Sequence, residues 1–174
     1  MTNILLISLI IAIIILIVLV CLRVLPVWTL YVYILGTMFC FITWEVWMSL
    51  GIVDGDSYRD RGGTGSSNIV NAITMALGDG FLILGMVGIC IGLFGKSAFN
   101  SWNWKVFAVF FLIGFTQNII VALIKTNLVH GKDLSLAPFM PIKTESIIQQ
   151  QETWILAPIF FYLLFINTKI IPKS

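Results

Sequence analysis

The chain is organised as long apolar stretches separated by shorter polar ones. Each apolar stretch is about as long as the ~20 residues that an α-helix needs to cross a bilayer, so each predicts a membrane-spanning helix. We therefore expect an all-α integral membrane protein in which about five helices form a small bundle. The predicted helices cover Ile4–Leu22, Val27–Ile52, Asn68–Phe94, Trp102–Val129 and Thr153–Ile171.

The polar segments between these helices are of two kinds. Arg23 and Pro26 mark a tight turn after the first helix, and residues 96–100 predict a second short connection. Residues 53–67 are rich in glycine and residues 130–151 contain two prolines, so both predict long loops without an apolar period.

Composition supports placement in a membrane. Of the 174 residues, 59% are hydrophobic and 10% are charged, whereas soluble domains carry about 25% charged residues. Residues 1–24 lack a basic leading segment and an Ala-x-Ala-like cleavage site, so we interpret them as a retained anchor helix. Residues 25–174 then predict a four-helix membrane bundle. A net charge of +2 from scattered basic residues gives no indication of nucleic-acid binding.

Charge also suggests an orientation. The basic residues are nearly balanced between the two sides, so the positive-inside rule decides little. An N-out, C-in orientation is expected because it places both long loops and most of the acids outside. Those acids are Asp54, Asp56, Asp60, Asp133, Glu145 and Glu152.

Two carboxylates, Glu45 and Asp79, stand inside predicted membrane helices. A charged side chain at the centre of a bilayer costs about 2.5–3.5 kcal/mol on insertion scales. Such residues usually face a bundle interior or a cavity, where they pair, bind a ligand or carry protons. We therefore take these two acids as the first candidates for a functional site.

Depth estimates place several polar residues in the same half of the membrane. With a helix rise of ~1.5 Å per residue, Glu45 lies roughly 9 Å and Asp79 roughly 16 Å below the outer boundary. Asn118 has about the depth of Asp79, and Lys125 follows it on nearly the same helical face. This predicts a common cavity that opens toward the long loops. Alternatively, Gln117 and Asn118 only hold helices together, at about 0.6 kcal/mol for each interhelical hydrogen bond.

Aromatic residues flank the first acid. Trp44 and Trp47 beside Glu45 suit a cavity for an amphipathic cation, through cation–π attraction and charge pairing. They are equally typical of the aromatic belt at a membrane interface.

Other motifs predict packing rather than chemistry. Cys21, Cys40 and Cys90 lie in apolar stretches without metal-ligand spacing, and the single histidine has no partner residues nearby in the sequence, so we expect no metal. No nucleotide or cofactor fingerprint occurs, so we expect no cofactor. Gly88 and Gly92 form a G-x-x-x-G pair that predicts close helix packing within the bundle.

The layout resembles the EXPERA membrane fold, which emopamil-binding sterol isomerases share with the sigma-two receptor. The motifs that carry this resemblance are Trp44-Glu45-Val46-Trp47, Gly78-Asp79-Gly80, Thr116-Gln117-Asn118 and Ala157-Pro158. The resemblance implies that Glu45 and Asp79 line a cavity for sterol-like or cationic amphiphilic ligands. The isomerases use a histidine in proton transfer, and no predicted helix core here contains one, so the resemblance favours binding over isomerisation.

The leading hypothesis is therefore a polytopic membrane protein that binds a lipid-like or cationic amphiphilic ligand. An enzymatic version has one acid move a proton on an isoprenoid or sterol-like substrate. The alternative is an accessory subunit of a larger membrane complex, whose polar residues pair with partner helices. Proton-coupled transport is less favoured because the chain lacks inverted repeats and broken helices.

Overall fold

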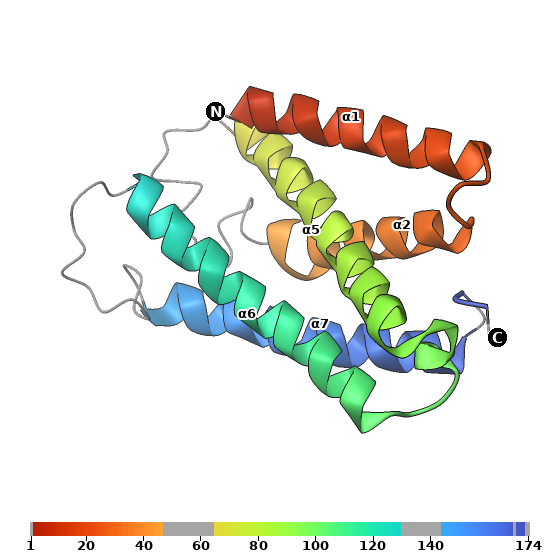
Figure 1. Ribbon diagram of the computed structural model, residues 1–174. Helices are drawn as coiled ribbons and strands as arrows, with labels where there is room; N and C mark the ends of the chain where they lie inside the picture. The colour runs from red at the N-terminus through yellow and green to blue at the C-terminus, as the bar shows by residue number, and fades with distance from the viewer. Residues whose placement is uncertain (1, 47–64, 130–143, 169, 173–174) are drawn as a thin grey trace. The chain divides into compact units, whose positions relative to one another are not determined.

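A computed structural model describes residues 2–46, 65–129, 144–168 and 170–172. Within these ranges the protein is entirely helical and contains no strand, which confirms the all-α fold (Figure 1). The helical elements are α1 (Thr2–Cys21), α2 (Trp28–Cys40), η1 (Phe41–Glu45), α5 (Gly65–Phe94), η2 (Lys96–Phe99), α6 (Trp104–Val129) and α7 (Thr144–Asn167).

The contacts divide the chain into two compact units. The first unit is Met1–Ile89 with Ile170–Pro172, and the second is Cys90–Lys169 with Lys173–Ser174. The boundary runs through α5 near its end, so α1 belongs with α2 and most of α5. The predicted division into an anchor helix at residues 1–24 and a membrane bundle at residues 25–174 stays a prediction.

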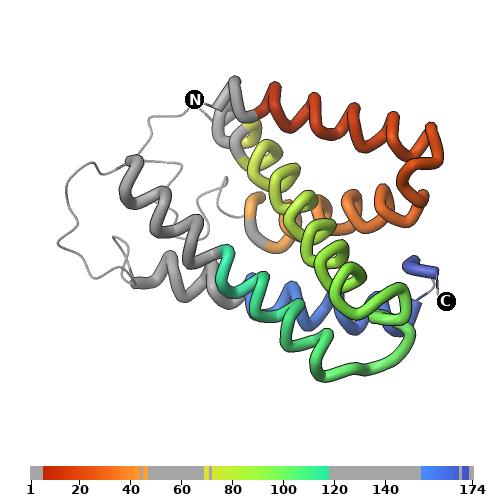
Figure 2. Tube along the Cα trace, in the orientation of Figure 1, coloured from red at the N-terminus to blue at the C-terminus, as the bar shows by residue number. Residues whose placement is uncertain are grey.

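In the first unit, α1 and α2 form a helical hairpin, and α2 runs opposite to α5 (Figure 2). Arg23 ends α1 in the left-handed region, with φ 58°. The Arg23 N–H donates to the Val20 carbonyl at 3.0 Å, and the Val24 N–H donates to the Leu19 carbonyl at 2.9 Å. These bonds form a Schellman-type cap, in which glycine is the usual residue at the left-handed position. The tight turn predicted here is thus confirmed.

The side chains of α1 are exposed on almost every face. Among those that the structure describes, Leu16 is buried, whereas the side chains of the surrounding isoleucines and valines are largely open. Exposed residues on α1 include Ile7, Ile10, Ile11, Ile14, Ile15, Ile17 and Val18. An apolar surface this continuous is typical of contact with lipid or with another protein.

The second unit has an aromatic core. α6 and α7 lie side by side and run in opposite directions (Figure 1). Phe99 of η2 packs edge-on against Phe110 of α6 at 6.0 Å between ring centroids, and against Phe165 of α7 at 5.6 Å. Residues 96–100 were predicted as a simple connection, but their 3₁₀ turn supplies a fully buried ring. Gly95 precedes this turn with φ 79°, a conformation that suits glycine.

Two helix boundaries differ from the sequence prediction. α2 gives way to a π-helical turn, η1, instead of continuing as one α-helix through the second apolar stretch. α7 begins at Thr144, not near Thr153, so residues 144–151 are helical where a loop was predicted. Hydropathy locates the part of a helix that suits lipid, whereas glutamate and glutamine in this segment are good helix formers that extend α7 without being apolar.

Among the described residues, one helix is long and apolar enough to cross a bilayer by itself. It is the Ala72–Phe94 part of α5, and 28% of its most apolar window is buried. The described parts of α1, α2, α6 and α7 contribute shorter apolar helices.

Candidate functional site

In the first unit, α2 and α5 approach each other closely at two glycines. A Cβ atom added to Gly36 of α2 would lie 3.3 Å from the Gly80 Cα of α5 and 3.0 Å from the Ile83 Cβ. A Cβ atom added to Gly80 would overlap the Thr37 Oγ1 and lie 2.9 Å from the Tyr33 carbonyl oxygen. Small residues let helix backbones approach closely, so Gly36 and Gly80 bring α2 and α5 together.

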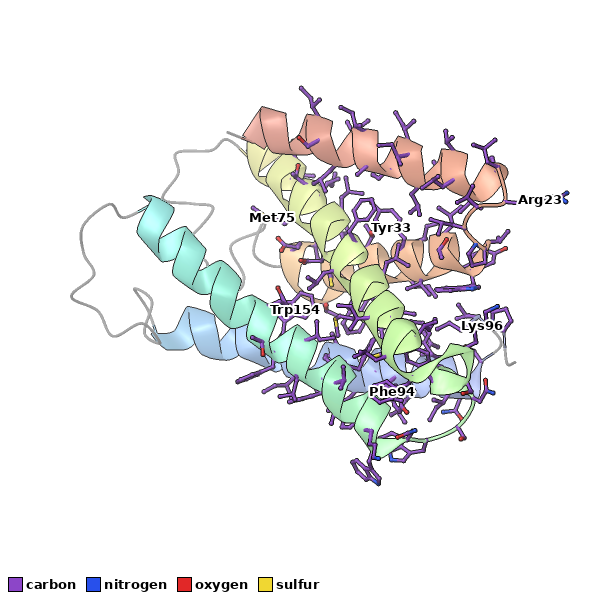
Figure 3. All side chains as sticks on the ribbon, viewed as in Figure 1. Arg23, Tyr33, Met75, Phe94, Lys96 and Trp154 are labelled. Atoms are coloured by element: carbon purple, nitrogen blue, oxygen red, sulfur yellow. The ribbon has the colours of Figure 1, made fainter. Side chains whose placement is uncertain are left out.

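Polar side chains on α2 line this contact. Tyr33, Thr37 and Cys40 follow one another at spacings of four and three residues, which places them on one helical face. Tyr33 and Cys40 are buried, and Thr37 is half-buried. The Tyr33 ring, labelled in Figure 3, also packs against the Phe81 ring of α5, with 4.5 Å between centroids. The face of α2 that meets α5 is therefore polar, although the helix as a whole is apolar.

The π-helical turn η1 continues this face to Glu45. The Val46 N–H donates to the Phe41 carbonyl, five residues earlier, so the turn contains one residue more than an α-helical turn. In an α-helix, Trp44, four residues after Cys40, would lie on the same face as Cys40. The wider π-helical turn favours Glu45, five residues after Cys40, on this face, and the Glu45 side chain is buried. Such π-helical insertions occur frequently at functional sites.

Cys40 connects the two predicted acids. Its thiol lies close enough to the Asp79 and Glu45 side chains to interact electrostatically with both. Glu45 is buried and Asp79 half-buried. In the first unit two carboxyl groups thus interact with the same buried thiol, near the contact between α2 and α5. Carboxyl groups in an apolar setting can attract a cation when they are ionised.

Two hydroxyl groups complete the polar face. The Tyr33 hydroxyl and the Thr37 Oγ1 are shielded from solvent, and neither has a hydrogen-bond partner in the described part of the chain. The two hydroxyl groups lie near each other, but their contact lacks the geometry of a hydrogen bond. A buried hydroxyl left without a partner costs about 1–3 kcal/mol. By contrast, the buried Thr29 hydroxyl donates to the Pro26 carbonyl at 2.7 Å.

The structure describes the other predicted site residues only in part. Gln117 lies on α6 in the second unit, and its amide nitrogen is buried without a hydrogen-bond partner among the described residues. Asn118 and Lys125 follow it on α6, but their side chains lie outside the described set, as does the side chain of Trp44. Trp47 lies outside the described residues altogether. The common cavity for the acids and Asn118 therefore stays a prediction.

Sequence reasoning missed the other polar residues that line the α2–α5 contact. Cys40 was interpreted as packing, and Tyr33 and Thr37 were not considered as site residues. Close packing was predicted at Gly88 and Gly92, but a Cβ atom at either position would have nothing within 4 Å among the described atoms. The signal that could have found the true contact is the alignment of Tyr33, Gly36, Thr37 and Cys40 on one face.

The cluster does not resemble a metal centre. Within the described ranges, no group of three or more histidine, cysteine, aspartate or glutamate side chains is arranged to hold a metal ion. Cys40, Glu45 and Asp79 are therefore better suited to hydrogen bonding and charge pairing than to metal ligation.

Comparison with known proteins adds no assignment. No protein-family model, no curated protein and no solved structure matches the chain. The resemblance to the EXPERA fold consequently stays a prediction, and the function must be argued from the α2–α5 site.

Proposed function

We propose that this is a polytopic membrane protein that binds a lipid-like or cationic amphiphilic ligand at Glu45 and Asp79. The observation that carries the proposal is that both acids interact electrostatically with the buried Cys40 thiol near the α2–α5 contact. Carboxyl groups in apolar surroundings attract a ligand ammonium group when ionised, and donate a hydrogen bond to a ligand oxygen when protonated.

Placement in the membrane is part of the same proposal. α5 is long and apolar enough to span a bilayer, and the open isoleucines of α1 suit lipid contact better than water. The proposed arrangement has five spanning helices, with the N-terminus outside and the C-terminus inside. Glu45 and Asp79 would then lie in the outer half, where a ligand reaches them from the bilayer or from outside.

An enzymatic form of the proposal uses the same two acids. One of them would move a proton on an isoprenoid or sterol-like substrate while the other holds the charge that develops. The alternative role is an accessory subunit of a membrane complex. It is supported by the amide nitrogen of Gln117, which has no hydrogen-bond partner among the described residues and could bond to a partner helix.

Native mass spectrometry of the detergent-purified protein tests the proposal. We expect a small-molecule adduct on the wild type that is lost from the Glu45→Gln/Asp79→Asn double variant. Glu152→Gln is the matched control, because Glu152 lies on α7 in the second unit. It should keep the adduct.

Two outcomes would count against ligand binding at these acids. An adduct that is retained by the double variant would place the ligand elsewhere. A second polypeptide bound equally to all three proteins would support the accessory-subunit role instead.

A further inference from the structure

Tyr33 and Thr37 are the part of the polar face that the proposed binding of a cation leaves unused. Both hydroxyl oxygens are fully shielded and lack partners in the described part of the chain. Tyr33 as a residue is 4% exposed. The protein could carry phenylalanine and valine here with nearly the same shape and without two unpaired polar atoms. Retaining the hydroxyls therefore calls for a partner that they bind at some stage.

Their position connects them to the acids. The Thr37 Oγ1 and the Tyr33 Cε2 are both in contact with the position where Gly80 would carry a Cβ atom, and Gly80 directly follows Asp79. Cys40, one helical turn further along α2, interacts electrostatically with Asp79. The Tyr33 and Thr37 side chains thus lie beside the residue that follows Asp79 in α5. A ligand held by Asp79 has the hydroxyls as its next polar neighbours along α2.

We propose that the Tyr33 and Thr37 hydroxyls form a second polar subsite, which binds a hydroxyl or carbonyl group of the same ligand. The inference rests on the proposed function, because it assumes that Glu45 and Asp79 anchor the ligand. It defines the ligand more narrowly, as an amphiphile with a hydrogen-bonding oxygen a few carbons from its cationic group. Since both oxygens are shielded, the Tyr33 or Thr37 side chain must rotate away from Gly80 as the ligand enters.

A subsite of this kind predicts opposite effects on stability and on binding. Without ligand, Tyr33→Phe and Thr37→Val each remove a buried polar atom that has no partner, so the unfolding temperature should rise by roughly 2–4 °C. With ligand, the same substitutions remove hydrogen bonds and should weaken binding. Hydroxyls that are bonded within the protein would instead lower the unfolding temperature when removed.

Two probes separate this subsite from the acids. Dodecylamine carries the cationic group alone, and 4-hydroxydodecylamine adds a hydroxyl group four carbons away. Native mass spectrometry titrations give the Kd of each probe for the wild type, for Tyr33→Phe/Thr37→Val and for Glu45→Gln/Asp79→Asn. Tyr31→Phe is the matched control, because Tyr31 is exposed on the same helix.

We expect the hydroxylated probe to bind the wild type roughly three- to tenfold more tightly than dodecylamine. Tyr33→Phe/Thr37→Val should abolish this advantage and leave the Kd of dodecylamine unchanged, whereas the matched control should keep the advantage. Equal binding of the two probes by the wild type, with both lost from the acid variant, overturns the subsite but supports the acids as the anchor. A wild type that binds neither probe overturns the cationic ligand itself, and the subsite with it.

Discussion

Tyr33 in the first unit and Tyr162 in the second are both buried tyrosines on apolar helices, yet their hydroxyl groups have different surroundings. The Tyr162 hydroxyl accepts a hydrogen bond from the Asn103 N–H at 2.9 Å and donates one to the Asn103 carbonyl at 3.1 Å. The Tyr33 hydroxyl has no such partner among the described residues. Tyr162 thus links α7 to the start of α6 through two hydrogen bonds, whereas the Tyr33 hydroxyl makes no hydrogen bond among the described residues.

The packing around the two tyrosines differs in the same sense. Tyr162 lies among aromatic rings, with Phe99, Trp102 and Phe107 at 5.1–5.8 Å between centroids. Around Tyr33 the helices meet through Gly36 and Gly80, with polar side chains alongside. Interlocking rings and satisfied hydroxyls stabilise a fold, whereas close backbones with unpaired polar groups are typical of sites that give up stability for function. The comparison therefore supports the proposal that the binding site lies in the first unit.

The largest expected effect comes from breaking the glycine contact of the first unit. Gly80→Ala should lower the free energy of unfolding by about 3 kcal/mol, because its Cβ atom would collide with the α2 backbone as well as with Thr37. Thr37 can rotate, but the Tyr33 carbonyl cannot. Unfolding in mixed micelles measures the change.

Gly78→Ala is the matched control for this substitution. It lies two residues away on the same helix, and an added Cβ atom there has nothing within 4 Å among the described atoms. Because alanine is the better helix former, Gly78→Ala should be neutral or stabilise by up to about 1 kcal/mol. If the two variants had equal stability, the close approach of α2 and α5 at Gly80 would be wrong.

A smaller effect is expected from the tyrosine of the second unit. Tyr162→Phe should destabilise by about 2 kcal/mol, because it leaves the Asn103 N–H and carbonyl without their partner. The same unfolding measurement on Tyr33→Phe should give a change of opposite sign. Two tyrosine-to-phenylalanine changes with the same sign and size would remove the distinction between the units.

The sequence predicted the helices well because each one is marked by a long apolar run. It also singled out Glu45 and Asp79, because a carboxylate in such a run is costly, and the structure brings both to Cys40. Their role in binding stays a prediction. The sequence could not supply the register between the helices. The hydropathy profile of this segment does not show whether Trp44 or Glu45 faces α5, and the π-helical turn decides between the two.

Other features were missed because they depend on partners distant in the chain. Phe99 stands in a short polar segment, and only the rings of Phe110 and Phe165 make it part of a core. Gly80 and Gly88 look alike in sequence, but Gly80 meets another helix, whereas at Gly88 the described atoms leave open space. Whether a glycine lies at a close helix contact depends on the residue that faces it from the other helix, and a single sequence does not show which residue that is.

The smallest effect concerns how helices begin in the two units. The Asn103 Oδ1 accepts a hydrogen bond from the Lys105 N–H at 3.0 Å and so caps α6, whereas Val27 at the start of α2 makes no side-chain cap. Asn103→Ala should therefore cost about 1 kcal/mol, and Val27→Ala should show no loss of capping.

The double variant Asn103→Ala/Tyr162→Phe sharpens this last prediction. Both side chains fix the same turn of backbone, one from within α6 and the other from α7, so their effects on the free energy of unfolding should not add. The combined loss of unfolding free energy should be smaller than the sum of the single losses. Once the first change has loosened the turn, the remaining hydrogen bond stabilises it less. Strict additivity would mean that the cap and the Tyr162 hydroxyl act independently, and that the second unit owes its stability to its aromatic rings rather than to a polar network at the start of α6.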